Sequence, residues 1–412
     1  MSHRENELQT RDMNISKDLK DSNNSSHKQK IFEYGFTVMS GLSRRTKRRL
    51  LKNFSEEEIL SFSDKELQMN LTSQEWIHYC KQKNQYNDKN QSNNKTQYND
   101  KNPCNYKNQF NIEETEKQWL DLGKKNIDFV YHKDDSYPEK LRQIEDYPLG
   151  LFKKGSLPGQ EKAIGIVGSR IPSAYGKEMA SYFARELSKA GVTIISGMAY
   201  GIDVASHKGA LDAGGLTFGV LGCGPDIVYP KENFAVYERM IRQGGILSEY
   251  MPGTIPASFR FPERNRIISG LSDGVLVVEA KAKSGSLITA DQALEQGKDV
   301  FALPGRAGDP LSEGCNWLIR EGARMVTEPS HILEELFHLC EQKVKNSLPS
   351  EKLLDNKEKV VYDCLSLDPK NIEEIINITN FTVSEVISIL FRLELNGYVS
   401  QIVKDYYIRR MI

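Results

Sequence analysis

The sequence lacks the features of several protein classes. It has six cysteines in 412 residues and no C-x-x-C pair, which argues against a disulfide scaffold or a zinc ribbon and suits a reducing compartment. No apolar run approaches the roughly 18 residues that a membrane helix needs. The polar start MSHRENELQT is unlike a signal peptide. We therefore expect a soluble, cytoplasmic protein without a membrane span.

An excess of charge of one sign is also missing. The 55 Lys and Arg residues balance 56 Asp and Glu residues, so the chain is not a polycation. Binding of nucleic acid or phosphate must then come from local groups of basic residues. Neither the dinucleotide-binding G-x-G-x-x-G fingerprint nor the Walker A motif G-x-x-x-x-G-K-[ST] occurs, which argues against hydride transfer and NTP hydrolysis.

The chain is 39% hydrophobic, and its polar stretches predict where domains begin and end. Residues 1–30 should be disordered. The hexamer QYNDKN, which occurs twice, marks a linker rich in Asn, Gln and Lys at 81–111. The other expected parts are a helical SAM-like domain at 31–80, a Rossmann-like domain at 112–339 with a lead-in at 112–163, a linker at 340–352, and a winged-helix domain at 353–412.

Six basic residues lie between Arg44 and Lys52, after a glycine-led turn. This segment resembles helix-hairpin-helix or SAM-like modules, which often contact DNA phosphates. A solvated basic helix face would look the same, and the sequence leaves both interpretations open.

Short β-branched runs alternate with helical periodicity from Ile164 to Leu336. This pattern predicts an α/β fold, a Rossmann-like parallel sheet with helices on both faces. We expect strands at 164–167, 192–195, 217–221, 245–247, 275–278, 300–303 and 323–326, and helices at about 176–190, 203–213, 233–243, 289–296 and 330–339.

Ligands bind at the carboxyl ends of the strands in such a sheet. Five of the six loops expected there are rich in Gly and Ser, which let backbone N–H groups approach an anion. A tight turn explains one such loop, but five on one edge favour a phosphate-lined cleft. The candidate phosphate-binding residues are Gly168, Ser169, Arg170, Gly197, Lys231, Arg264, Asn265, Arg266, Ser284, Gly285 and Ser286. The arginines at 264 and 266 could instead form salt bridges with Glu263 or Glu279.

No cluster pairs a nucleophile with a base or suits a metal ion, and no cofactor is expected. Ser206 and His207 are neighbours on an expected helix and therefore point apart.

Several long motifs occur in a fixed order: G-S-R-x-x-S-x-Y-G at 168–176, S-G-M-A-x-G-I-D at 196–203, Y-P-K-E-N at 229–233, F-P-x-R-N-R at 261–266 and S-G-S-L-I-T at 284–289. The chain thus resembles the bacterial DNA-processing protein A family (DprA/Smf) over about 164–328. The resemblance implies a non-enzymatic single-stranded DNA-binding protein of natural transformation, which protects incoming strands, loads the RecA recombinase and forms a homodimer. It implies phosphate contacts from Arg170 and Lys231, whereas Tyr200 stands where family members often have Arg.

Two other functions remain open. A nucleotide-binding or phosphoribosyl-cleaving enzyme would use Glu249 or Glu279 as its acid, although Gln292 stands where that family's motif has Glu. The second open function is a DNA-binding regulator that acts through the winged helix alone.

The winged-helix segment and the end of the α/β domain carry two further expectations. Residues 353–412 hold seven basic and nine acidic side chains, so we expect weak DNA contacts and mainly protein–protein roles there. Its apolar residues Val386, Ile389, Leu390 and Leu393 should be core. The homodimer should form through residues 310–340. The apolar residues of this segment supply the interface, although some of them must instead be core: Leu311, Trp317, Leu318, Ile319, Ile332, Leu333 and Leu336.

Overall fold

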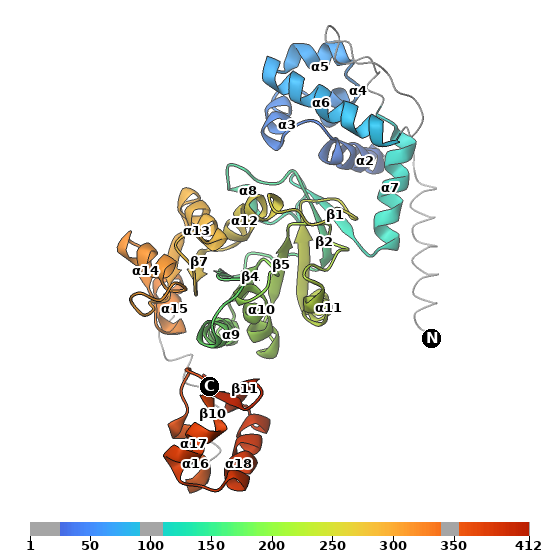
Figure 1. The fold of residues 1–412 in the computed structure, drawn as a ribbon. Coiled ribbons are helices and arrows are strands. Elements are labelled where there is room, and N and C mark those ends of the chain that lie inside the picture. The colour runs from blue at the N-terminus through green and yellow to red at the C-terminus, as the bar shows by residue number, and fades with distance from the viewer. Residues whose placement is uncertain (1–24, 91–109, 339–353, 412) are drawn as a thin grey trace, which may run out of the picture. The chain divides into compact units, whose positions relative to one another are not determined.

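The computed structural model describes residues 25–90, 110–338 and 354–411 (Figure 1). They fall into two compact units: the first runs to Asp134 and includes Pro148–Leu151, and the second holds the remainder. Most of the segment 1–30 that was expected to be disordered lies outside the described residues, as do most of the Asn-rich linker and the linker at 340–352.

Short helices, begun by side-chain caps, build the first unit. The side chains of Ser55 and Ser63 each accept a backbone N–H from the first turn of the helix that follows. A glutamate side chain in that turn accepts the backbone N–H of the serine, so two capping boxes start two successive helices. Tyr34 is buried and packs edge-on against Trp119 and Phe129. The elements are α2 (Ser25–Val38), α3 (Arg44–Leu50), α4 (Glu56–Ser61), α5 (Asp64–Asn70), α6 (Ser73–Asn90), α7 (Ile112–Lys124) and β1 (Asp128–Tyr131).

Two of the six basic residues around α3 stabilise this first unit. Lys47 is 5% exposed, and its ammonium donates to the backbone carbonyls of Thr37 and Met39, each at 2.7 Å. Arg49 forms a salt bridge of 2.7 Å with Glu75. The basic residues around α3 therefore do not form a uniformly solvated face.

Three details of the first unit differ from the sequence analysis. Helix α2 begins at Ser25, within the expected disordered segment, and α6 ends at Asn90, within the expected linker. Cys80 is disulfide-bonded, whereas Cys223, Cys315 and Cys364 are free thiols.

A mostly parallel sheet forms the centre of the second unit, which confirms the predicted α/β class. Its strands lie in the order β2-β6-β5-β4-β3-β7-β8-β9. Strand β2 (Gly150–Gly155) runs antiparallel to β6, with Phe152 opposite Ser248, and was missed within the expected lead-in. The parallel strands are β3 (Ala163–Val167), β4 (Thr193–Ser196), β5 (Thr217–Leu221), β6 (Gly244–Ser248), β7 (Gly274–Val277), β8 (Asp299–Ala302) and β9 (Arg324–Met325).

Helices cover both faces of this sheet (Figure 1). Between residues 135 and 338, the helices of the second unit are α8 (Glu139–Arg142), α9 (Ala174–Lys189), α10 (Ile202–Asp212), α11 (Phe234–Arg242), α12 (Arg260–Leu271), α13 (Gly285–Glu295), α14 (Glu313–Arg320), α15 (Pro329–Phe337) and the single-turn η1 (Lys231–Asn233). Helices α12 and α14 were not expected, and α13 begins four residues earlier than predicted.

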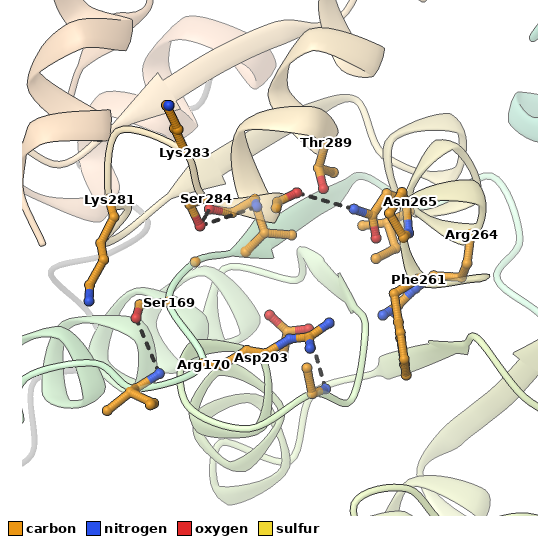
Figure 2. Close-up of a pocket in the computed structure, with 18 residues that line it drawn as sticks. Ser169, Arg170, Asp203, Phe261, Arg264, Asn265, Lys281, Lys283, Ser284 and Thr289 are labelled. Atoms are coloured by element: carbon orange, nitrogen blue, oxygen red, sulfur yellow. Dashed lines mark hydrogen bonds between the residues drawn. The ribbon is translucent and has the colours of Figure 1, made fainter. Parts of the chain in front are cut away.

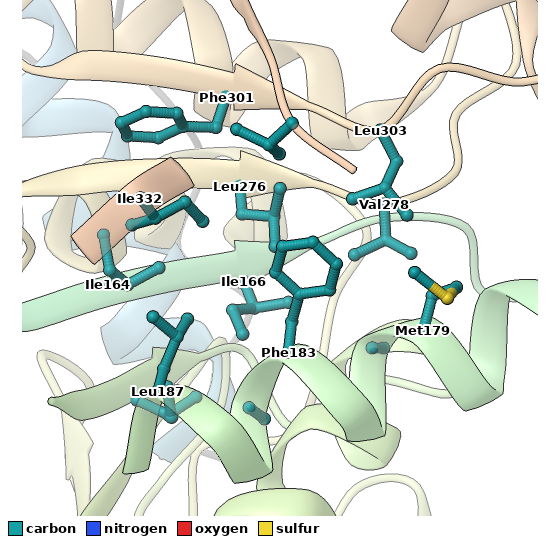
Figure 3. Packing of buried hydrophobic residues seen from close by; sticks show 14 of the residues in the cluster. Ile164, Ile166, Met179, Phe183, Leu187, Leu276, Val278, Phe301, Leu303 and Ile332 are labelled. Carbon is teal, nitrogen blue, oxygen red and sulfur yellow. The ribbon is translucent and has the colours of Figure 1, made fainter. Parts of the chain in front are cut away.

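The main hydrophobic core lies between the sheet and the helices α9, α10 and α15. Phe183 and Leu187 of α9 pack against Ile164 and Ile166 of β3, and Ile332 of α15 joins them (Figure 3). On the opposite face of β3, a β-carbon on Gly165 would lie 3.4 Å from Ile268 of α12. Alternate residues of β3 thus face different helix layers, as expected for a strand buried on both sides.

A winged-helix domain ends the chain, as predicted. Its elements are α16 (Asn356–Cys364), β10 (Lys370–Asn371), α17 (Ile372–Thr379), α18 (Val383–Leu395), β11 (Val399–Val403) and β12 (Tyr406–Arg409). The predicted core residues Val386, Ile389, Leu390 and Leu393 are all buried, which confirms that expectation. Within the described residues, no single helix is both long and apolar enough to cross a membrane, and α17 and α18 meet that test only together, across a 110° bend.

Candidate functional site

A cavity of about 430 Å³ opens at the carboxyl ends of β3 and β7 (Figure 2). These neighbouring strands are where the strand order reverses: from β3 the chain proceeds to β4, β5 and β6 on one side, and from β7 to β8 and β9 on the other. Loops that leave in opposite directions open a crevice at such a point, and open α/β sheets place their ligands there. The sheet topology therefore positions the cavity independently of any motif.

The loop after β3 is held by Glu279, the second residue after β7. The backbone N–H of Ser169 donates to the Glu279 carbonyl at 2.7 Å. The Glu279 carboxylate accepts the Ser173 backbone N–H at 2.9 Å and the Ser173 hydroxyl at 2.5 Å, at the start of α9. A buried carboxylate at a helix N-terminus is favourably placed, so one residue joins both strands to α9.

Arg170 extends from this loop and remains available to a ligand. Its side chain is exposed, and the guanidinium lies 4.9 Å from the centre of the Phe261 ring. Among the described residues, no salt bridge holds it. Phe261 itself packs against Tyr229, with ring centres 5.7 Å apart. Arg170 is thus a cation that lies beside an aromatic ring and, among the described residues, forms no salt bridge.

The loop after β7 brings two lysines and a helix N-terminus to the same cavity. Lys281 and Lys283 are exposed and line the opening. Ser284 caps α13, and its hydroxyl accepts the backbone N–H of Ser286. Figure 2 shows these residues on one side of the cavity, opposite Phe261 and Asn265. Helix N-termini and ammonium groups both attract negative charge, so this side of the cavity carries a positive electrostatic potential.

Arg264 is a buried residue in the wall of the cavity. It is 3% exposed, and Nη1 donates to the carbonyl of Val220 in β5. Burial lowers the pKa of Arg264 to about 10, while the nearby Asp203 carboxylate opposes that shift. Asp203 accepts the backbone N–H of Ala199 at 3.3 Å, and burial raises its pKa. The two side chains hold the loop after β4, which includes Gly197.

Arg266 lies in an ion-pair cluster away from the cavity. It is 5% exposed, bonds Glu249 at 2.6 Å and lies 3.1 Å from Asp146. The alternative of a salt bridge to Glu263 or Glu279 is therefore wrong in its partners, which are Glu249 and Asp146. Both carboxylates come from other segments, so Arg266 ties β6 and the 135–147 segment to α12.

A second, smaller depression adjoins the cavity across Arg170. Gly197, Tyr200, Tyr229 and Pro230 line it. The Tyr200 hydroxyl donates to Glu232 at 2.8 Å. Lys231 follows Pro230 on η1 and is exposed, but it does not line the main cavity.

The residues considered for catalysis are engaged elsewhere. Glu249 and Glu279, the acids of the alternative enzyme, pair with Arg266 and with Ser173. His207 is fully buried and bonds Thr217 at 2.7 Å. It does not bond Ser206, whose hydroxyl donates to the backbone carbonyl of Asp203. In the described parts of the chain, no group of His, Cys, Asp and Glu residues is arranged to hold a metal ion.

Eight of the eleven predicted site residues line the cavity: Gly168, Ser169, Arg170, Arg264, Asn265, Ser284, Gly285 and Ser286. Gly197 lies beside it, whereas Lys231 and Arg266 do not contribute to its walls. Lys281, Lys283 and Phe261 also line the cavity but were not among the predicted residues. The lysines stand three and five residues after the predicted strand 275–278, in the same loop as the candidate Ser284, so reading that loop for basic residues would have found them.

Comparison with known proteins gives consistent matches. Residues 128–337 match the family described as DNA recombination-mediator protein A, and residues 345–402 match the DprA winged helix domain. The chain is 39% identical over 308 residues to Protein Smf of Escherichia coli (strain K12), covering 71% of this chain and 80% of that protein. It is 48% identical over 202 residues to DNA processing protein DprA of Bacillus subtilis (strain 168), covering 48% and 68%. The X-ray structure of DNA processing protein A from Streptococcus pneumoniae matches with a TM-score of 0.59 and 32% identity, over 74% of this chain and 98% of that one.

Proposed function

Because this chain belongs to the DNA-processing protein A family (DprA/Smf), we propose that it is a non-enzymatic protein that binds single-stranded DNA during DNA uptake. The observation that carries the proposal is the group of Arg170, Lys281 and Lys283 around a cavity at the α13 N-terminus. These cations contact phosphate without reading bases, as sequence-independent binding requires.

Each predicted residue has a place in this proposal. Arg170, Ser169 and the first residues of α13 contact phosphate. Lys231 meets the strand beyond the main cavity, past the depression that Arg170 shares with Tyr229. Arg264 and Arg266 position the surrounding loops, since both are buried and bonded to protein groups.

Fluorescence anisotropy with labelled oligonucleotides tests the proposal. The protein should prefer single strands to duplex, and binding should weaken steeply with salt because neutralised phosphates release counterions. Arg170→Ala should lower the affinity about 10- to 100-fold, the value of one or two charge-assisted hydrogen bonds. Lys208→Ala removes an exposed charge from α10, outside the cavity, and should change little. Equal binding by the wild type and Arg170→Ala would contradict the site.

Chemical assay separates the proposal from the enzyme alternative. Incubation with AMP-type nucleotides should release no ribose phosphate, since Glu249 and Glu279 are engaged in internal contacts. Release that depends on either carboxylate would favour the phosphoribosyl-cleaving enzyme instead.

We propose further that the protein forms a homodimer and loads the RecA recombinase onto the bound strand, in the cytoplasm. Support for the dimer comes from α14 and β9, where Trp317 is 41% exposed and Met325 is 57% exposed. Leu318, Ile332 and Leu333 are buried, so these members of the predicted set belong to the core. Trp317→Ser combined with Met325→Ser should convert a dimer to a monomer by light scattering. A wild-type chain that is monomeric at micromolar concentration would overturn the dimer.

A further inference from the structure

Two tyrosines border the depression that adjoins the main cavity. Tyr200 belongs to the loop after β4, and Tyr229 lies just before η1. Both line the depression together with Arg170. The two tyrosines are 43% and 41% exposed, so neither ring is used up in filling the core. The depression therefore offers aromatic surface to a ligand, directly beside a cation.

The loop that carries Tyr200 is tied to its neighbours on both sides. Asn233 of η1 is 5% exposed, and its side-chain amide donates to the Met198 carbonyl at 2.9 Å. The Ile202 backbone N–H donates to the Ser169 carbonyl at 3.2 Å, in the loop after β3. These bonds join the loops after β3 and β4 to η1, so binding does not have to order them first.

A carboxylate holds the hydroxyl of Tyr200. This hydroxyl donates to Glu232 at 2.8 Å, and Glu232 is exposed and directly follows Lys231. A negative charge near a phosphate backbone opposes binding of the strand, so Glu232 does not serve that backbone. Its bond occupies the polar group of Tyr200 and directs the ring. The face of the ring is what remains for a ligand.

We propose that Tyr200 stacks on a nucleobase of the strand whose phosphates Arg170 and Lys231 contact. The inference rests on the proposed function, because a bound strand is what brings a base to this place. Arg170, Tyr200 and Pro230 line one depression, and Lys231 follows Pro230 directly. A strand that runs from one cation to the other must cross the tyrosine.

Stacking on Tyr200 suits a protein that prefers single strands. Every base has a flat aromatic face, so the contact tolerates any sequence. A base that is paired within a duplex is stacked between its neighbours and has no free face to offer. The tyrosine therefore adds affinity for unpaired nucleotides, whereas Arg170 and Lys231 supply attraction to any phosphate backbone.

A nucleobase fits this surface better than a protein partner does. A stable protein contact covers about 800 Å² on each side, far more than two half-exposed rings can offer. A base is planar, matches a single ring in size and arrives attached to a phosphate that Arg170 attracts. The small area and the neighbouring cation thus both favour a nucleotide.

Abasic oligonucleotides test the inference, because they keep every phosphate and lack the bases. On oligothymidylate, Tyr200→Ala should lower the affinity about 5- to 150-fold, which is what one stacked base contributes. On an abasic strand of the same length, Tyr200→Ala should bind as well as the wild type. Tyr200→Phe should keep most of the affinity for oligothymidylate, since it retains the ring and loses the bond to Glu232.

Tyr406→Ala is the matched control. Tyr406 is 40% exposed on β12 and lines neither the cavity nor the depression, so its loss should change binding to neither strand. Salt dependence gives a second readout. Tyr200→Ala should leave the slope of log affinity against log salt unchanged, whereas Arg170→Ala should reduce it by about one, because a phosphate contact is lost there.

Equal losses for Tyr200→Ala on the normal and the abasic strand would overturn the inference, since Tyr200 would then support the site without touching a base. An unchanged affinity on both strands would overturn it as well. In either case, weaker binding by Arg170→Ala would leave the proposed function standing. A wild-type protein that bound no single-stranded DNA would overturn the proposed function and this inference together.

Discussion

The Arg264 guanidinium occupies the space that a side chain on Gly197 would need. A β-carbon built on Gly197 would lie 2.0 Å from Arg264 Nη1. Because Arg264 is buried and bonded to the Val220 carbonyl, it has little room to move aside. Gly197→Ala should therefore destabilise the protein by about 1–3 kcal/mol, as overpacking of a buried site does.

Urea unfolding of Gly197→Ala measures that loss. Gly285→Ala is the matched control, since a β-carbon at Gly285 meets nothing within 4 Å and its stability should be close to that of the wild type. Equal stability of the two variants would show that Arg264 moves freely.

Arg266 should matter for stability more than for DNA binding. Removing one partner of a buried ion pair leaves an uncompensated charge and costs about 3–5 kcal/mol. Arg266→Ala should accordingly lower the urea midpoint, while Arg266→Met combined with Glu249→Leu should recover much of the loss. Normal stability with lost single-strand affinity in Arg266→Ala would assign Arg266 to the ligand after all.

His207 should make the folded protein less stable in acid. Burial lowers the pKa of His207 to about 3, from 6.5 in an unfolded chain. Thr217 donates its hydroxyl hydrogen to the Ile194 carbonyl, so His207 Nδ1 donates to Thr217. The lowered pKa keeps the folded ring neutral near pH 7. The unfolded chain then binds the extra proton, and stability is lost as the pH falls from about 6.5 toward 3.

The loss from this one group is at most about 1.4 kcal/mol per pH unit. His207→Gln should flatten the dependence of unfolding free energy on pH between 7 and 5 by up to that slope. Parallel curves for the wild type and the variant would show that His207 takes up its proton equally in the folded and unfolded states.

Lys281 and Lys283 should contribute to the salt dependence of DNA binding. Each lies at the cavity and forms no salt bridge with another described residue. Replacing either with Ala should reduce the slope of log affinity against log salt by about one. Lys231→Ala tests the residue that the sequence analysis favoured. If Lys231→Ala lowered the affinity while Lys281→Ala and Lys283→Ala did not, we would conclude that the DNA strand binds outside the cavity.

The winged helix should be dispensable for single-strand affinity. Its outer helix is apolar, and its segment carries a net charge of −2. Deleting residues 345–412 should change the affinity by less than about tenfold, or 1.4 kcal/mol. A greater loss in anisotropy titrations would make this domain a principal DNA contact.

The sequence predicted the sheet well where strands are continuous apolar runs. Strand β5 has the expected bounds 217–221, because every residue in it is buried. Strand β2 was missed because its partner β6 is distant in sequence and only its first half is buried. Helix α13 was placed too late, because its first turn, Gly-Ser-Leu, shows no helical periodicity.

The sequence predicted most of the residues that line the cavity, but it did not predict which of them are buried and bonded to other protein groups. Glycine, serine and arginine after strands located the cavity, since strand ends share one edge. The burial of Arg266 depends on Asp146 and Glu249, which no local pattern connects to it. Likewise, the apolar residues of α18 are visible in the sequence, but which of its faces the domain covers is decided by α16 and α17.

The concave shape of the cavity has a consequence for selectivity. Its walls are joined by Glu279, which binds the loop after β3 and caps α9, so the protein has little freedom to open them. A ligand must then supply the flexibility. Duplex DNA stays straight over about 150 base pairs and presents a convex surface, whereas a single strand can dip one phosphate into a recess. Discrimination between the two forms can thus come from the mechanics of the nucleic acid, with no base recognised.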